Sequence, residues 1–214
     1  MQFNNTHSSS QRDNQGLSHF MKRPPAAWAA IYGSEKYPSV KGTVRFYQMK
    51  NGVLVVAEVD GLPKSSSPCQ SPVFAFHIHD GVSCQKSIIE PRNGNNNSGS
   101  QNGNNNNSSQ NGNLQPPDSP QPPDEDITTP ENDPFPHSGT HYNPNGCPHP
   151  YHAGDMPPLF GADGYAFLTF VTSRFTVNEI VGKTVIIHSS PDDFTTQPSG
   201  NSGEKIACGL IVER

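Results

Sequence analysis

Short segments rich in β-branched and aromatic residues, separated by glycine and proline, recur along this chain and constrain its fold most strongly. Seven of them are predicted strands, at 26–33, 43–47, 53–60, 73–79, 165–172, 184–188 and 206–212. Lys50-Asn51-Gly52 is a hairpin turn signal between the second and the third. No segment shows a long apolar period of 3.6 residues, so the sequence predicts an all-β sandwich or barrel.

A polar, acidic tract interrupts these strands. Residues 93–140 contain three hydrophobic residues, six acidic residues and no lysine or arginine. Eleven asparagines lie in 93–113, and eight prolines lie in 116–136. Because this composition cannot bury enough apolar surface to offset the entropy of ordering, we predict a disordered insert over 93–136. The insert interrupts a domain that spans 26–214, and a disordered polar leader is predicted over 1–25.

The insert also biases the charge of the chain. The whole sequence carries a formal net charge of -5. Without 93–140, it keeps 14 basic and 13 acidic residues, so the domain is close to neutral. A near-neutral domain excludes the simple interpretation of a strongly basic nucleic-acid-binding protein. No run of 18 apolar residues is present, and we therefore expect neither a nucleic acid nor a membrane as a partner.

The cysteines and the start of the chain favour different compartments. Cys69, Cys84, Cys147 and Cys208 are too far apart for CxxC metal or redox chemistry. Their even number fits up to two disulfides, which favours an oxidising compartment. Residues 1–22 show no apolar segment after a basic start, so no signal peptide is visible. We expect a cytoplasmic protein from this absence, and an exported protein is the alternative that the cysteines favour.

Two histidines occupy a predicted strand. His77 and His79 are two positions apart, so their imidazoles project from one face, opposite Phe74, Phe76 and Ile78. This spacing suits two ligands of one metal. Exposed histidines, or histidines hydrogen-bonded within the protein, are the alternative.

A denser group follows in a loop rich in proline and glycine. His141, His149, His152 and Asp155 lie within 15 residues of one another. Three imidazoles and one carboxylate fit a closed tetrahedral zinc site, which would hold a loop that has little core of its own. A solvated histidine-rich loop is the alternative interpretation.

Five strings of residues, taken in order along the chain, resemble the copper/zinc superoxide dismutase family. They are His77-Ile-His-Asp-Gly-Val-Ser-Cys84, Gly139-Thr-His-Tyr-Asn-Pro144, His152-Ala-Gly-Asp155, Val185-Ile-Ile-His-Ser-Ser-Pro-Asp-Asp193 and Gly200-Asn-Ser-Gly-Glu-Lys-Ile-Ala-Cys-Gly209. The short gap from His79 to Cys84 looks more like the bacterial branch than the animal one. The resemblance implies a Greek-key β-sandwich, or flattened eight-stranded barrel, of immunoglobulin-like architecture with long metal-binding loops.

The resemblance also implies a role for each candidate residue. Copper would be bound by His77, His79, His141 and His188, and zinc by His141, His149, His152 and Asp155, with His141 between both metals. Asp192 matches an aspartate that hydrogen-bonds one copper histidine and one zinc histidine. Cys84 and Cys208 match the disulfide that the family forms within one subunit.

The other two cysteines lie outside the family pattern. We hypothesise a second disulfide between Cys69 and Cys147, which would pin the zinc loop to the entrance of the His77 strand. Two unpaired thiols in a reducing cytosol are the alternative. Mass spectrometry of peptides prepared without reduction distinguishes the two, because free thiols at both positions contradict the hypothesis.

The implied activity is the disproportionation of superoxide to dioxygen and hydrogen peroxide, an oxidoreductase reaction with copper and zinc as cofactors. His141 would deliver a proton. Lys205 occupies the position of the family's active-site arginine, and a point charge in place of a planar fork of donors predicts reduced activity. A non-catalytic copper/zinc-binding protein of the same fold, or an interaction module that uses the asparagine-rich tract, are the alternatives.

The position of the insert is a departure from the family. It lies between Cys84 and His141, where the family has only a few residues. About 50 extra residues are tolerable because loop-closure entropy grows slowly with length. The six acids would repel an anionic substrate at low salt if they lay near the site. In many relatives this part of the loop helps to form the dimer interface, so whether this chain forms a homodimer stays open.

Overall fold

The structure, a computed structural model, describes residues 22–67, 72–85 and 132–214. Seven strands of this part form one antiparallel sheet in the order β5-β8-β9-β1-β2-β3-β7. These strands are β1 (Ala27–Gly33), β2 (Lys41–Met49), β3 (Gly52–Asp60), β5 (Phe76–His79), β7 (Ala166–Thr172), β8 (Thr184–His188) and β9 (Lys205–Glu213). The predicted all-β fold is confirmed. The predicted leader up to residue 21, and most of the predicted insert, lie outside the described residues.

Three short elements complete the described part. β4 (Val73–Phe74) and β6 (Leu159–Phe160) form a separate two-stranded sheet. The helical segments are one turn each, η1 (Pro136–Ser138) and α2 (Val177–Ile180). No helix within the described ranges is long and apolar enough to cross a membrane.

The β2–β3 hairpin forms where the turn signal predicts it. The two strands pair from Lys41 and Asp60 to Met49 and Gly52, so that residues 50 and 51 make the turn. Gly52 has a φ angle of 147°, a backbone conformation that residues other than glycine rarely adopt. β9, the last strand, pairs with β1, the first, so that both ends of the described chain lie side by side in the sheet.

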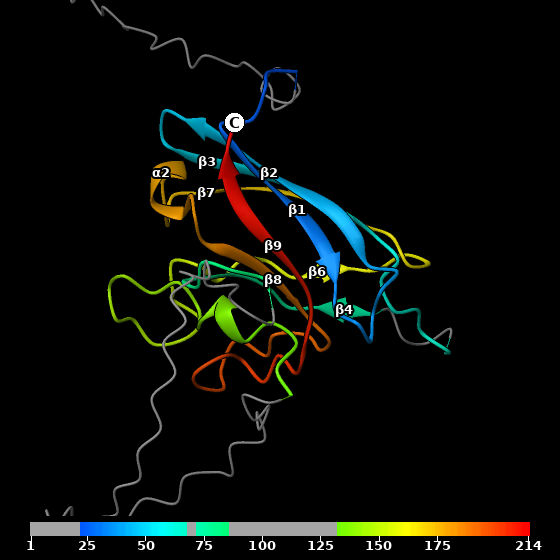
Figure 1. Cartoon of the computed structure of the whole chain (residues 1–214). Coiled ribbons are helices and arrows are strands. Elements are labelled where there is room, and N and C mark those ends of the chain that lie inside the picture. The colour runs from blue at the N-terminus through cyan, green and yellow to red at the C-terminus, as the bar shows by residue number, and fades with distance from the viewer. Residues whose placement is uncertain (1–21, 68–71, 86–131) are drawn as a thin grey trace, which may run out of the picture.

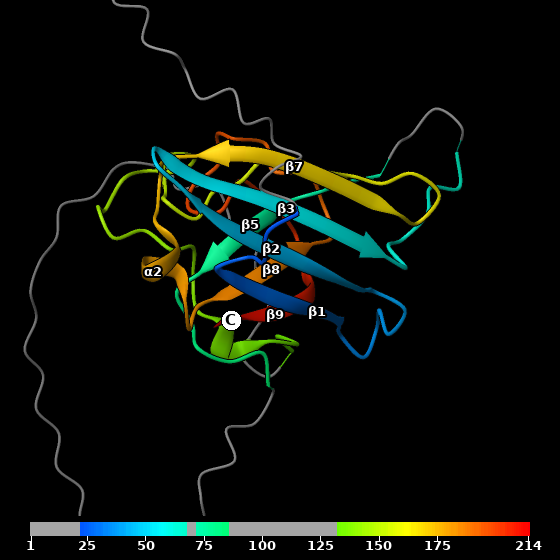
Figure 2. The same ribbon diagram turned by 90° about the horizontal axis from the view of Figure 1, so that it is seen from above.

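The sheet curls around its own core. Figure 2 shows β5 and β8 passing across β2 and β3. Fully buried side chains from both sides fill the space between them, among them Val44, Val55, Phe76, Val185 and Ile187. Burial of a side chain of this size stabilises the fold by about 1.5–3 kcal/mol, so this packing keeps β5 and β8, which carry candidate ligands, in place.

The predicted strand 73–79 is divided in two by Ala75. The Ala75 N–H donates to Ser190 O at 2.8 Å, and Ala75 O accepts from the His188 N–H at 2.9 Å. β5 therefore continues beside the end of β8, whereas β4 turns away to pair with β6. The predicted alternation of faces is confirmed, because Phe74, Phe76 and Ile78 lie in the hydrophobic core cluster and the two histidines do not.

Two long loops meet at one end of the sheet. Figure 1 shows the segment after η1, in green, and the segment between β8 and β9, in orange, lying together below the strands. A disulfide between Cys84 and Cys208 ties the chain after β5 to β9, with the two Cα atoms 5.7 Å apart. This predicted disulfide is confirmed. Cys69 lies outside the described residues and Cys147 is in no disulfide within them, so the second disulfide stays a prediction.

Candidate metal centre

The free edge of β5 brings the candidate ligands together. β5 is an edge strand of the sheet, and residues 139–155, here called the ligand loop, run along its outer side. Isolated antiparallel bridges pair His77 with Asp155 and His79 with His141. Between them, Ile78 exchanges backbone hydrogen bonds with the loop on both sides. Ligands that are some 60 residues or more apart in sequence thus become neighbours because a loop takes the place of a further strand.

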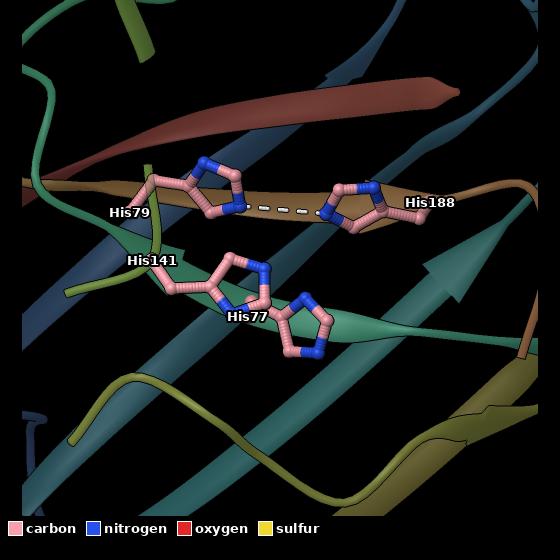
Figure 3. A group of neighbouring side chains, drawn as sticks. All are labelled: His77, His79, His141 and His188. Carbon is pink, nitrogen blue, oxygen red and sulfur yellow. Dashed lines mark hydrogen bonds between the residues drawn. The ribbon is translucent and has the colours of Figure 1, made fainter. Parts of the chain in front are cut away.

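Four imidazoles from two strands and the ligand loop form the first group. Figure 3 shows His77 and His79 from β5, His188 from β8 and His141 from the loop pointing toward a common centre. All four side chains are buried, and one ring nitrogen from each lies within 4.8 Å of the other three. His79 Nε2 and His188 Nε2 are 3.4 Å apart.

Backbone carbonyls determine which nitrogens of this group face the centre. His79 Nδ1 donates to Gly139 O at 2.9 Å, and His188 Nδ1 donates to Gly203 O at 3.1 Å. Because a carbonyl oxygen only accepts, each neutral ring carries its hydrogen on Nδ1 and presents a bare Nε2. Two lone pairs facing each other at 3.4 Å repel, and a cation between them removes that repulsion. The donor arrangement therefore fits a metal.

The second group consists of four ligand-loop residues. His141, His149, His152 and Asp155 are buried, and each offers one atom within 4.8 Å of the others. His141 Nδ1 lies 2.7 Å from Asp155 Oδ1 and 3.3 Å from His152 Nδ1, and His149 Nδ1 lies 3.1 Å from Asp155 Oδ2. Three imidazoles and one carboxylate, closed off by burial, are the donor set of a structural zinc site.

Unpartnered nitrogens identify the metal-facing atoms independently. Four buried side-chain polar atoms of the described residues have no hydrogen-bond partner, and three of them are His77 Nδ1, His141 Nε2 and His149 Nδ1. An orphaned buried polar atom costs about 1–3 kcal/mol unless something satisfies it. All three belong to the two groups, so coordination of metal ions accounts for them. His141 offers Nε2 to the first group and Nδ1 to the second, which makes it the residue they share.

Asp192 connects the two groups from behind. Its Oδ2 accepts from His77 Nε2 at 2.9 Å, and its Oδ1 accepts from His149 Nε2 at 2.8 Å. These bonds leave Nδ1 of each ring as its metal-facing atom, as expected for a carboxylate that orients metal ligands. Gly200 makes room for this contact, since a Cβ there would collide with the Asp192 carboxylate, and its φ of 71° also favours glycine.

Burial holds His77, His79 and His188 of the first group in the protonation state that metal binding requires. It lowers the pKa of His77 to about 4, and it lowers the pKa values of His79 and His188 well below their usual range, with neighbouring imidazoles adding to the effect. Burial alone would raise the pKa of Asp192, but the hydrogen bonds that it accepts, first of all from His77, lower it to about 2. These three rings are therefore neutral near neutral pH, as metal-binding imidazoles must be, and the Asp192 carboxylate is ionised.

The metal-free protein should lose stability as the pH falls from 7 to 5. The pKa of His77 is about 4 when folded and 6.5 in an ordinary environment, so the unfolded chain binds more protons in this window. The stabilisation is therefore complete above about pH 6.5 and is lost toward pH 4, and His77 alone removes about 2 kcal/mol by pH 5. Urea unfolding of chelator-treated protein measures this change. A free energy of unfolding that is constant or larger at pH 5 would contradict it.

A cavity of about 330 Å³ opens onto the first group. His79, His141 and His188 line it, together with Lys205 at the start of β9. Lys205 reaches this position because it pairs with His188 across the β8–β9 ladder. Its ammonium Nζ lies 2.6 Å from Asp133 Oδ2.

The comparisons with known proteins agree with this geometry. The family model described as copper/zinc superoxide dismutase matches residues 40–211, most of the chain. This chain belongs to that family. It is therefore an oxidoreductase whose cofactors are copper and zinc, and both metal-ligand groups lie within the matched residues.

The relatives of this chain include bacterial and animal proteins. Superoxide dismutase [Cu-Zn] 2 of Aquifex aeolicus is 26% identical, over 80% of this chain and 79% of its own length. Extracellular superoxide dismutase [Cu-Zn] of Rattus norvegicus is 32% identical over 35% of this chain and 34% of the rat protein. The Cu/Zn superoxide dismutase from Brucella abortus matches in structure with a TM-score of 0.54, covering 86% of this chain and 98% of its own. At 21% identity, that last likeness shows the fold alone.

The structure adds two residues near the ligand groups that the sequence did not point to. One is Asp133, the partner of Lys205. The other is Arg174, between β7 and α2, whose Nη1 donates to the carbonyl oxygens of Pro150, His152 and Asp155 at 3.0, 3.3 and 3.1 Å. Arg174 thereby holds in place the end of the ligand loop, which carries His152 and Asp155 of the second group. No local sequence signal marks either residue, because both act on partners far away in the chain.

Replacing Arg174 with alanine should weaken zinc binding about tenfold or more, because residues that orient metal ligands typically contribute 10- to 100-fold in affinity. Competition with a chromophoric chelator measures the dissociation constant. Arg45→Ala is the matched control, since the Arg45 guanidinium contacts the half-exposed Glu58 and its neighbour on the strand Thr43, both at 3.3 Å, and neither belongs to a ligand group. Equal zinc affinity in the two variants would show that Arg174 does not position the ligand loop.

Proposed function

We propose that this protein disproportionates superoxide: two superoxide anions and two protons give one dioxygen and one hydrogen peroxide. In this proposal the first group holds copper, through His77, His79, His141 and His188, and the second group holds zinc, through His141, His149, His152 and Asp155. When bound, copper supplies the one-electron redox chemistry, and zinc supplies a fixed positive charge beside it. The observation that carries the proposal is His141, which offers one nitrogen to each group.

The chain's own residues supply the rest of the chemistry. The reaction consumes protons, and His141 Nε2 is a nitrogen at the cavity with no hydrogen-bond partner, so it would be the atom that holds a proton there whenever it is not bound to copper. Asp192 keeps His77 and His149 in the ligand tautomer. The substrate is a small anion, and Lys205 is the cation that lines the cavity. The cavity lies beside His79, His141 and His188, which is where superoxide would have to react.

The test is to load the purified protein with copper and zinc and to measure superoxide consumption together with metal content. We expect one copper and one zinc per chain and rapid consumption of superoxide. Stoichiometric metal with no consumption would instead support a non-catalytic metal-binding protein of the same fold. No stoichiometric metal would support an interaction module.

Exchanging Lys205 for arginine should raise the rate of superoxide consumption. Arginine presents a planar fork of five N–H donors, so it can keep the contact with Asp133 and still offer donors to a diatomic anion, whereas lysine is a point charge. A rise of about two- to fivefold is expected at low ionic strength. Stopped-flow decay of superoxide measures the rate. An unchanged or lower rate in Lys205→Arg would contradict the assigned role of Lys205.

The disulfide also bears on the compartment of the protein. The Cys84–Cys208 disulfide supports an oxidising compartment, and hence the exported alternative to a cytoplasmic protein. Cell fractionation tests this choice. A homodimer stays a prediction, and sedimentation of the full chain tests it.

A further inference from the structure

Lys205 lies between the cavity described above and the end of the predicted insert. Its side chain lines the cavity, and its ammonium group lies against the segment that precedes η1. There it contacts Asp133 Oδ2 at 2.6 Å and Phe135 O at 3.5 Å. The side chains of Lys205 and Asp133 are 16% and 13% exposed, so this ion pair is shielded from water on most sides. Partly buried pairs are screened by salt much less than surface pairs.

The carboxylate of Asp133 is held in place from both sides. While Oδ2 faces Lys205, Oδ1 accepts the backbone N–H of Phe135 at 2.8 Å. Phe135 is 6% exposed and packs with Ile186, Cys208 and the disulfide partner of Cys208. The segment is thus anchored to β8 and β9 next to the cavity. This anchoring holds the Asp133 carboxylate in contact with the Lys205 ammonium group.

Other carboxylates near Lys205 are engaged elsewhere. Glu204, its neighbour on the chain, accepts from Lys36 and Tyr37, both at 2.6 Å. Asp192 is bonded to the two imidazoles described above. Within the described residues, Asp133 is therefore the one carboxylate in ion-pair contact with Lys205. Of the six acids in residues 93–140, Asp133 is also the one that lies within the described residues.

We propose that Asp133 masks Lys205, so that the cavity attracts and binds small anions less strongly than the lysine alone would allow. This inference rests on the proposed function, in which the cavity receives superoxide. Asp133 is a positioning residue, because it acts on the substrate through Lys205. The local charge of the Lys205–Asp133 pair is zero, and an incoming anion must compete with a carboxylate already in contact with the ammonium group.

The test uses azide, a linear monoanion, as a probe of the full-length protein loaded with copper and zinc. Titration followed by the Cu(II) absorption spectrum gives the azide dissociation constant without any turnover. Asp133→Asn removes the charge but keeps an oxygen for the Phe135 N–H, and Asp133→Ser keeps a shorter acceptor. At low ionic strength, both variants should bind azide about two- to fivefold more tightly than the unmodified protein, with a steeper salt dependence.

The matched control is Asp163→Asn, the same charge change at an exposed ion pair with Lys64 that does not line the cavity. It should leave the azide dissociation constant within experimental error. In a Lys205→Met background, the effect of Asp133→Asn should shrink markedly, because the masked cation is gone. Equal azide affinity in Asp133→Asn and Asp163→Asn would overturn the proposal. Weaker azide binding in Asp133→Asn would also overturn it, since Asp133 would then hold Lys205 in its binding position.

Superoxide consumption separates this inference from the proposed function. If the unmodified protein consumes no superoxide but Asp133→Asn tightens azide binding, the masking holds and the proposed reaction fails. If superoxide is consumed and azide affinity does not respond to Asp133, the reaction holds and the masking fails. Where both hold, Asp133→Asn should also raise the rate at low ionic strength by about the same two- to fivefold factor.

Discussion

Substituting His141 with alanine should lower superoxide consumption by at least about a hundredfold, because even residues that only orient metal ligands contribute up to that much. The substitution removes Nε2 from the first group and Nδ1 from the second, so both metals lose a ligand at once. It also removes the nitrogen to which we assign a proton. Stopped-flow decay of superoxide measures the rate, and mass spectrometry of the dialysed protein measures copper and zinc content.

His137→Ala is the matched control for this experiment. His137 lies on η1, four residues before His141, and belongs to neither ligand group. This variant should keep one copper and one zinc per chain and a rate within about a factor of two, as usual for a substitution outside the site. A His141→Ala protein with full metal content and an unchanged rate would show that neither metal depends on His141 as a ligand.

Removing the Cys84–Cys208 disulfide should lower the free energy of unfolding by about 2–5 kcal/mol. The bond joins residues 124 positions apart, so it closes a long loop that contains the insert. It also packs with Phe135 and Ile186 beside the start of β9, and its loss would loosen the anchor of the Asp133 segment. Urea unfolding of the metal-free Cys84→Ala/Cys208→Ala protein, compared with the oxidised unmodified protein, measures the change.

Reduction of that double variant supplies the control. The double variant retains Cys69 and Cys147. If these two are free thiols, a reductant should leave the unfolding midpoint of the double variant unchanged. A further loss of stability on reduction would instead support the predicted second disulfide. A double variant as stable as the oxidised protein would contradict the structural role of the Cys84–Cys208 bond.

The strands of this protein were predictable because their signals are local. In the segment 73–79 the apolar side chains alternate with histidines, and the structure puts the apolar ones in the core. The hairpin at Gly52 is equally local, since the turn residues lie between the strands that they join. The division of 73–79 into β4 and β5 was not predictable, because it depends on hydrogen bonds between Ala75 and the far end of β8.

The identities of the candidate ligands were also within reach of the sequence. His77 and His79 are spaced for one face of a strand, and the resemblance to the family placed His141, His188 and Asp155 with them. The structure brings all of these residues into the two groups. Which nitrogen of each ring faces a metal was out of reach, because it follows from carbonyl oxygens and a carboxylate that come from other loops.

By itself, the sequence determined an all-β fold and two sets of candidate metal ligands, since residue type and short-range spacing carry that information, and the resemblance to the family predicted that Lys205 takes the place of an arginine. Only the tertiary structure decided how that lysine is used. Asp133 is 72 residues from Lys205 and lies at the end of a tract predicted to be disordered. The contact exists because Phe135 packs beside the disulfide. Packing over such a distance, rather than any local pattern, determines the charge that the cavity presents to an anion.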